Sequence, residues 1–216
     1  MQKLIVSLLG LKGGSGKSTT ARMLATAYAE AGLSVKIADF DVWQQTASQW
    51  SARRLGKGHK PDVPVECFNS IKKVLREPCA IMICDVAGNP EVSALKIAEA
   101  SDVILIPTDV SVDDLASQLS FIRQLVNAGI DRSKIMMVVN NLYENATASE
   151  AAREAISAQG LAHTKSELVG RPAYQNAQNQ GLAVYQTQFA SLNDRALNVA
   201  REIIEFVKSK TEDKAA

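Results

Sequence analysis

Residues 12–19 are the part of this 216-residue chain whose residue types and spacing most clearly indicate chemistry. They read Lys-Gly-Gly-Ser-Gly-Lys-Ser-Thr, between an apolar run at 4–9 and an alanine-rich segment at 21–31. In a glycine-rich loop between a strand and a helix, backbone N–H groups can converge on phosphate oxygens. We therefore predict a phosphate-binding loop formed by Lys12, Gly13, Gly14, Ser15, Gly16, Lys17, Ser18 and Thr19.

Two lysines and a serine of this loop have separate expected roles. Lys17 is expected to reach the outer phosphates, and the Ser18 hydroxyl is expected to ligate Mg²⁺. The ordinary loop has a glycine five residues before Gly16, whereas this chain has Leu11 there, followed by the additional lysine Lys12. A lysine on so short a loop can place its charge on a partner's phosphates across a dimer interface, as an arginine finger does. The alternative is a solvated surface lysine beside a generic nucleotide loop.

An acidic motif follows the next apolar strand. A short apolar strand with Val35, Ile37 and Ala38 leads into Asp39-Phe40-Asp41. With the lysine-first loop, this motif resembles the deviant Walker A ATPases of the ParA/MinD family, and most of all the small ParA-type partition ATPases. In that family the first lysine is the signature residue and ATP is sandwiched between two subunits. The resemblance implies that Asp41 orients the attacking water and that Asp39 supports the Mg²⁺ shell.

The chain departs from the family directly after this motif. The family usually continues with Pro-Gln, whereas this chain reads Val42-Trp43-Gln44-Gln45, so a rigid turn is missing. Trp43 is expected either to pack on the loop or a partner, or to be an ordinary buried aromatic residue.

A second strand pattern ends in a single carboxylate. Residues 80–84 are apolar and Asp85 follows them. An aspartate at the carboxyl end of a buried strand lies where an α/β sheet presents its ligands, and it can hold a water of Mg²⁺ as a Walker B aspartate does. Residues 85–89 then read as a switch loop. The alternative, a carboxylate that only caps the next turn, is disfavoured by the phosphate loop upstream.

Alternating patterns predict the fold. Strand-like apolar runs lie at 4–9, 33–38, 80–84, 103–107 and 134–139. Helical patterns lie at 17–31, 45–55, 91–100, 112–128 and 148–159. This alternation predicts a doubly wound, mostly parallel α/β sheet with helices on both faces. Residues 56–64 are interpreted as a loop within one P-loop domain at 1–210, followed by a polar tail at 211–216.

Composition narrows the class of protein. The chain is 46% hydrophobic with a net charge of +1, and no run approaches the roughly 18 apolar residues of a membrane span. No signal peptide is evident, and Cys67, Cys79 and Cys84 form no CxxC pair, which favours a reducing cytoplasm. His59 and His163 lie in polar stretches and are interpreted as solvated rather than as ligands. We expect no metal other than a nucleotide-bound Mg²⁺.

Asn140 ends the apolar run at 134–139 on the predicted nucleotide side. In similar ATPases an asparagine here often touches the base, which makes Asn140 a candidate for base binding. A turn-forming asparagine is the alternative.

The C-terminal part carries the candidate DNA contacts. Residues 170–174 and 178–181 resemble a late segment of the family, in which basic residues bind the DNA phosphate backbone without reading sequence. The candidates are Arg171, Arg195, Arg201, Lys208 and Lys210. Their alternative role is on solvated helix faces interleaved with Glu202 and Glu205. Apolar residues recur along the last helix at a spacing that packs on the sheet, and the polar end of the chain disfavours a membrane anchor.

The resemblance therefore implies a ParA-like partition ATPase. It would bind ATP and Mg²⁺, form a homodimer, coat nucleoid DNA nonspecifically and hydrolyse ATP slowly until a ParB-like adaptor stimulates it. Because the chain begins at its phosphate loop, operator-specific repression by an N-terminal extension is not expected. Two alternatives stay open: a ParA-like ATPase that positions a protein cluster or organelle, and a metabolic P-loop ligase of the same superfamily.

Overall fold

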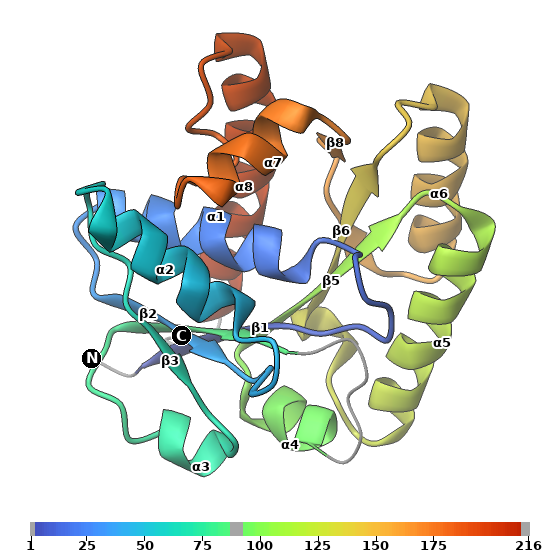
Figure 1. Cartoon of the computed structure of the whole chain (residues 1–216). Helices are drawn as coiled ribbons and strands as arrows, with labels where there is room; N and C mark the ends of the chain where they lie inside the picture. Colours follow the sequence, from blue (N-terminus) through green and yellow to red (C-terminus); the bar gives the residue numbers. More distant parts are fainter. Residues whose placement is uncertain (1–2, 87–92, 213–216) are drawn as a thin grey trace.

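The computed structural model describes residues 3–86 and 93–212. Its centre is a parallel sheet (Figure 1). The strand order is β3-β2-β4-β1-β5-β6-β7, and β8 also pairs with β6, nearer the carboxyl end of β6 than β7 does. The strands are β1 Leu4–Leu8, β2 Val35–Asp39, β3 Val65–Cys67, β4 Ile81–Asp85, β5 Val103–Asp109, β6 Ile135–Asn141, β7 Ala162–His163 and β8 Leu168–Val169. The predicted doubly wound α/β fold is confirmed.

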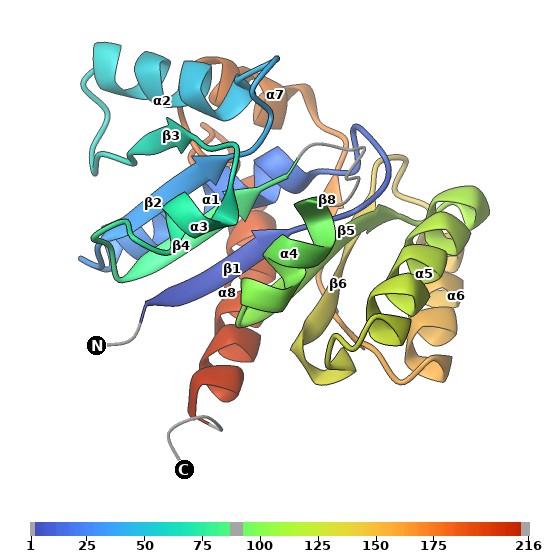
Figure 2. The same cartoon turned by 90° about the horizontal axis from the view of Figure 1, so that it is seen from below.

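Helices cover both faces of the sheet (Figures 1 and 2). One face is covered by α1 Lys17–Glu30, α2 Thr46–Gly56, α7 Pro172–Asn179 and α8 Ala190–Glu212. The other is covered by α3 Ile71–Val74, α4 Ser93–Ala100, α5 Val112–Asn127 and α6 Ala146–Ala158, with a 3₁₀ turn at Arg132–Lys134 before β6. Successive strand residues point to opposite faces, so each central strand contributes to both cores. In β1, Val6 packs toward α1 and Ile5 toward α4.

The sheet brings the predicted functional segments to one edge. β1 lies between β4 and β5 in the sheet. The loop that follows β1 therefore lies at the crevice where the strand order reverses direction. In a doubly wound sheet this switch point is where ligands bind. The register pairs Asp39 with Asp85 on neighbouring strands, and Leu8 with Asp85 on the other side. The phosphate loop and both acidic motifs therefore meet at the carboxyl edge.

The strand pattern predicted at 33–38 begins too early. Leu33 closes the turn after α1, because its backbone N donates to the carbonyl oxygen of Tyr28 at 3.0 Å, and β2 starts at Val35. The short elements β3, α3, β7 and β8 were not predicted, because two to four residues carry no readable periodicity.

Both histidine side chains are half-buried, so each is only partly solvated. His163 contacts the Ser157 hydroxyl at 3.0 Å, and His59 Nε2 is buried without a hydrogen-bond partner. Among the described residues, no helix combines the length and apolarity needed to cross a membrane. α8 extends two residues into the segment predicted as a tail.

Candidate nucleotide-binding site

The loop between β1 and α1 is built to hold an anion. α1 begins at Lys17, and its N-cap residue, Gly16, adopts φ 102° without a side-chain cap. The first N–H groups of a helix lack partners inside the helix, so an uncapped N-terminus can donate them to a ligand. Gly14 also has positive φ, at 78°. A Cβ on Gly16 would lie 2.7 Å from Asn140 Nδ2, so this position accommodates only glycine without displacement of Asn140.

Lys17 lies inside the loop and is buried. Its Nζ donates to the carbonyl oxygen of Lys12 at 2.7 Å. Burial lowers the pKa of Lys17, and the charge of Asp85 acts in the opposite direction. The Ser18 side chain lowers the pKa of Asp85, and both residues line one cavity, where the start of α1 faces the end of β4. Lys17, Ser18 and Asp85 therefore lie together, as the sequence predicts for phosphate and Mg²⁺ ligation.

Two buried carboxylates lie side by side at the ends of β2 and β4. Asp39 and Asp85 are only 1% and 4% exposed. The net pKa of Asp85 is raised to about 6. Burial is the largest cause and the charge of Asp39 acts in the same direction, whereas Ser18 and the cations Arg22 and Lys17 lower the pKa. Burial also raises the pKa of Asp39. Paired carboxylate oxygens beside a hydroxyl suit a hard divalent cation such as Mg²⁺.

Protein groups alone do not form a metal cage here. Among the described residues, no group of three or more His, Cys, Asp or Glu side chains could hold a metal ion. Mg²⁺ commonly takes one or two carboxylates and completes its shell with water and substrate phosphates. The residues present therefore fit a Mg²⁺ that arrives with a nucleotide.

Asp39 also organises the loop that follows it. Its Oδ1 accepts from Asp41 N at 3.0 Å and its Oδ2 accepts from Ala47 N at 3.2 Å, near the start of α2. Asp41 Oδ1 in turn accepts from Gln44 N at 2.9 Å and from Trp43 N at 3.3 Å. These bonds form a turn where the family usually has proline.

Asp41 lines a cavity of about 250 Å³ together with Lys17, Ser18 and Asp85. The structure thus places the predicted water-orienting carboxylate in the same cavity as the predicted phosphate and Mg²⁺ ligands. Trp43, two residues further on, is 92% exposed, so the interpretation as a buried aromatic residue is wrong.

A larger cavity of about 880 Å³ also borders the loop. It is within the size range of small-molecule sites and is lined by Asn140, Arg171, Gln178 and residues 12–16, among others. Asn140 Nδ2 donates to the Ser15 carbonyl oxygen at 2.7 Å, whereas its Oδ1 is buried without a hydrogen-bond partner. An unsatisfied buried acceptor is costly, and an exocyclic amine of a base could satisfy it.

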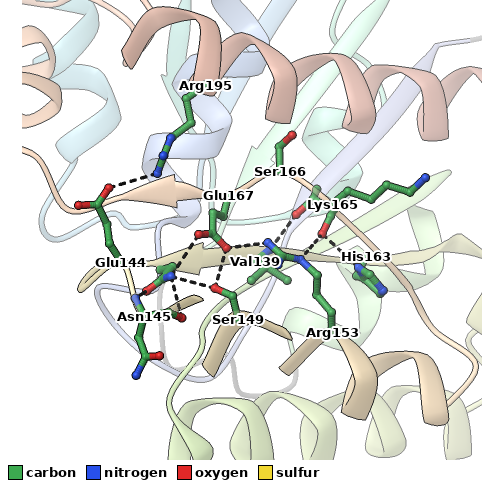
Figure 3. A network of polar contacts seen from close by, with 12 residues as sticks. Val139, Glu144, Asn145, Ser149, Arg153, His163, Lys165, Ser166, Glu167 and Arg195 are labelled. Carbon is green, nitrogen blue, oxygen red and sulfur yellow. Dashed lines mark hydrogen bonds and ion pairs between the residues drawn. The ribbon is translucent and has the colours of Figure 1, made fainter. Parts of the chain in front are cut away.

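The turn-forming role belongs to the neighbouring residue, Asn141. Its Oδ1 accepts from Asn145 N at 2.9 Å. Figure 3 shows the polar network behind this turn, in which Glu167 accepts from Asn141, from the Ser149 hydroxyl at 2.7 Å and from Arg153 at 2.6 Å. Burial raises the pKa of Glu167, but these three hydrogen bonds outweigh it and lower the pKa overall. The network fixes the end of β6, which carries Asn140.

Sequence reasoning gave neither Arg22 nor Gln178 a role at the nucleotide site. Arg22 projects from α1 and is nearly buried, with its guanidinium 5.9 Å from the centre of the Trp50 ring. Its Nη1 donates to Gln178 Oε1 at 2.9 Å, and Gln178 Nε2 donates to the Thr19 hydroxyl at 3.1 Å. α7 is thereby tied to the phosphate loop. The available signal for Arg22 was that it is the one basic residue of the alanine-rich segment at 21–31.

The candidate DNA contacts fall into two groups. Arg171 and Arg195 both pair with Glu144, the latter at 3.4 Å (Figure 3 shows this second pair). Arg201 and Lys208 are exposed further along α8, and Arg201 Nη1 donates to Asn198 Oδ1 at 3.0 Å. Lys210 Nζ lies 5.5 Å from the centre of the Phe206 ring. The structure thus brings two of the candidates together. The predicted switch loop lies largely outside the described residues.

Solved structures with this fold are numerous. MinD from Pyrococcus horikoshii OT3, complexed with Mg-ADP, aligns with a TM-score of 0.72 and 15% identity over 96% of this chain and 98% of that chain. A putative plasmid partition protein from Borrelia burgdorferi B31, bound to AMPPNP, aligns with a TM-score of 0.68 and 15% identity over 93% and 99%. The ATP complex of Cyanothece McdA(D38A) gives 0.66 and 16% over 94% and 96%.

At such low identity these likenesses establish the fold, and no curated protein sequence matches the chain significantly. The family assignment comes from sequence. A family model described as the CobQ/CobB/MinD/ParA nucleotide-binding domain matches residues 6–184, which include the phosphate loop, both acidic motifs and Asn140. The chain therefore belongs to the CobQ/CobB/MinD/ParA nucleotide-binding domain family.

Proposed function

We propose that this protein is a ParA-like partition ATPase that forms an ATP-dependent homodimer, binds DNA nonspecifically on the nucleoid and works with a ParB-like adaptor. The observation that carries the proposal is the separation of the two lysines. Lys17 is buried within the loop, whereas the Lys12 side chain is 42% exposed and lines the larger cavity. A lysine whose side chain is exposed beside the cavity can reach a second subunit.

Each residue of the site would have a separate role in phosphoryl transfer. Lys17 and the N–H groups at the start of α1 would hold the phosphates of ATP, and Ser18 with Asp85 and Asp39 would hold Mg²⁺. The ion would offset negative charge on the transferred phosphoryl group. Asp41 would orient the attacking water, because it shares a cavity with Lys17 and Ser18. Asn140 would contact the base. The ligands named for the MinD and Borrelia structures support ATP and Mg²⁺.

Exposed apolar side chains support a homodimer at this edge. They follow the carboxyl ends of β2, β5 and β6, next to the nucleotide site. They are Val42, Trp43, Val112, Leu142 and Tyr143, with Trp43, Val112 and Tyr143 more than four-fifths exposed. Large exposed apolar groups around a site are typical of an interaction surface. In a closed dimer they would exclude water from the nucleotide while Lys12 of each subunit reaches the other's phosphates.

DNA binding would be electrostatic. The net charge is only +1, so a cationic surface has to be local and doubled by dimerisation. Arg171 and Arg195 form its core beside the nucleotide cavity, and Arg201 and Lys208 extend it along α8. Because Arg171 also lines the nucleotide cavity, a bound nucleotide can act directly on a residue of this DNA-binding surface.

A nucleotide-dependent DNA-binding assay tests the proposal. With ATP and Mg²⁺ the protein should shift DNA duplexes of unrelated sequence equally, and log affinity should fall linearly with log salt concentration. Lys17→Ala should abolish the shift, because the loop loses its charged phosphate ligand, whereas Lys57→Ala in an exposed loop should retain it. Binding that ignores nucleotide, or that prefers one sequence strongly, contradicts the proposal. A metabolic ligase should not bind DNA at all.

A further inference from the structure

Three polar side chains form a chain of hydrogen bonds that ends at the phosphate loop. Arg22 Nη1 donates to Gln178 Oε1 at 2.9 Å, and Gln178 Nε2 donates to the Thr19 hydroxyl oxygen at 3.1 Å. Thr19 and Arg22 are three residues apart on α1 and therefore lie on the same side of that helix. Gln178 belongs to α7, so one amide group from a distant segment bridges two side chains of the helix that follows the loop.

The chemistry of these groups sets the direction of each hydrogen bond. A guanidinium group has donors but no acceptor, so the oxygen of the Gln178 amide has to face Arg22. The amide nitrogen, which only donates, then faces Thr19. The Thr19 hydroxyl oxygen accepts this bond, and its proton stays available for another acceptor. Arg22 thereby makes Thr19 a hydrogen-bond donor toward the site.

The amide of Gln178 is held in place from both sides. Arg22 is nearly buried beside the Trp50 ring, and within the described part of the chain its Nε is buried without a hydrogen-bond partner. Rotation of the amide would deprive Arg22 of a further partner, which is costly for a buried charged group. The chain just after α7 packs closely on α2, since a Cβ on Gly181 would lie 2.3 Å from Arg54 N. The amide therefore has one favoured orientation.

Thr19 lies beside both cavities of the site. It lines the cavity of about 250 Å³ together with Lys17 and Ser18, and the cavity of about 880 Å³ together with Asn140. A nucleotide with its phosphates at Lys17 and its base at Asn140 would run past the Thr19 hydroxyl. Phosphate oxygens accept hydrogen bonds, and a hydroxyl that donates to such a charged group binds it more strongly than a neutral acceptor.

We infer that Gln178 is a positioning residue for nucleotide binding. It keeps the Thr19 hydroxyl oriented as a donor to a phosphate of the nucleotide, and Arg22 fixes the orientation of the Gln178 amide. The inference rests on the nucleotide-binding part of the proposed function and requires neither the dimer nor DNA. It also explains why a polar chain extends from the loop to a nearly buried arginine that touches neither cavity wall of the phosphates nor the Mg²⁺ ligands through a hydrogen bond of its own.

A double-mutant cycle in MgADP affinity tests the inference. Thr19→Val removes the hydroxyl at nearly constant shape, and Gln178→Leu removes the amide. Calorimetry should show MgADP binding weakened by about tenfold or more for Thr19→Val and by about three- to tenfold for Gln178→Leu. With valine already at position 19, Gln178→Leu should have no further effect, because the amide acts through the hydroxyl. Equal losses in both backgrounds overturn the inference.

Further variants separate orientation of the hydroxyl from a structural role of α7. Arg22→Met frees the amide to rotate and should weaken MgADP binding by about threefold, whereas Thr19→Ser keeps the hydroxyl and should bind like the wild type. Asn176→Leu, at an exposed position of α7, is the matched control and should leave the affinity unchanged. If Gln178 only ties α7 to α1, Gln178→Leu lowers the urea midpoint without nucleotide and weakens binding equally with and without the hydroxyl.

The wild-type protein distinguishes failure of the inference from failure of the proposed function. If it does not bind MgADP, the nucleotide site itself is refuted, and the inference with it. If it binds MgADP and the cycle is additive, or Arg22→Met binds normally, the positioning role is wrong and the nucleotide site stands. If it binds MgADP and the cycle shows the expected coupling but no DNA is bound with ATP, the inference holds while the partition function is refuted.

Discussion

The buried carboxyl group of Asp85 leads to a prediction of how the free energy of unfolding depends on pH. Its pKa is raised from 3.8 to about 6 because burial disfavours its charged form more than Ser18, Arg22 and Lys17 favour it. A carboxyl whose pKa is higher in the folded than in the unfolded state binds more protons when folded, so its contribution to stability falls as pH rises from about 4 to about 6. Above that range, ionised Asp85 weakens the fold relative to a neutral isostere.

The magnitude follows from the shift. Each pKa unit corresponds to 1.36 kcal/mol, so a shift of about two units makes the Asp85→Asn variant more stable than the wild type by up to about 3 kcal/mol above pH 6. For a chain of this size that is roughly a 6–12 °C rise in Tm. Below pH 4 both side chains are neutral, and the difference should vanish.

Urea unfolding of both proteins without nucleotide, at pH 4.5 and pH 7.5, measures this directly. Glu150→Gln on the exposed face of α6 is the control for loss of one negative charge, and its effect should be small at both pH values. If Asp85→Asn is destabilised at pH 7.5, or if its effect is the same at both pH values, the cations and Ser18 outweigh burial. The reasoning about this carboxylate is then refuted.

The remaining predictions concern the loop and the catalytic roles. Gly16→Ala should lower nucleotide affinity by about tenfold or more in calorimetry, because φ 102° and a Cβ 2.7 Å from Asn140 Nδ2 cannot both be accommodated; unchanged affinity would place Asn140 elsewhere. Asp41→Ala should bind ATP and dimerise but not turn over, and stay on DNA. Lys12→Ala should bind nucleotide as a monomer and lose turnover, as light scattering would show. If the Lys12→Ala protein dimerises and hydrolyses ATP normally, Lys12 is an ordinary surface lysine without a role across the interface.

Local sequence signals were sufficient for the parts of the molecule that depend on local structure. The phosphate loop and the carboxylates Asp39 and Asp85 follow strands with clear apolar patterns, so the parallel sheet places them at one edge. The strands β1, β4, β5 and β6 were found for the same reason. Binding of nucleotide follows from the family match, whereas the individual roles of these residues stay predictions.

Contacts between segments far apart in the sequence could not be predicted from local sequence patterns. Arg22 is tied to Gln178 across 156 positions, and Asp114 is tied to Lys12 across 102. Nothing in either neighbourhood marks its partner, because such pairs depend on how helices pack on the sheet. Trp43 was equally ambiguous, since an aromatic residue is interpreted as buried unless the shape of its loop is known. That shape depends on the turn formed by Asp41.

The two tryptophans of this chain occupy opposite extremes of environment. Trp50 is fully buried, lies near the guanidinium groups of Arg22 and Arg54, and donates its indole N–H to the carbonyl oxygen of Leu182 at 3.0 Å. Trp43 is almost fully solvated at the edge of the nucleotide site. The intrinsic fluorescence of the protein therefore contains a red-shifted component accessible to aqueous quenchers and a shielded component that is not. The accessible component reports optically, without any label, on events at the mouth of the site.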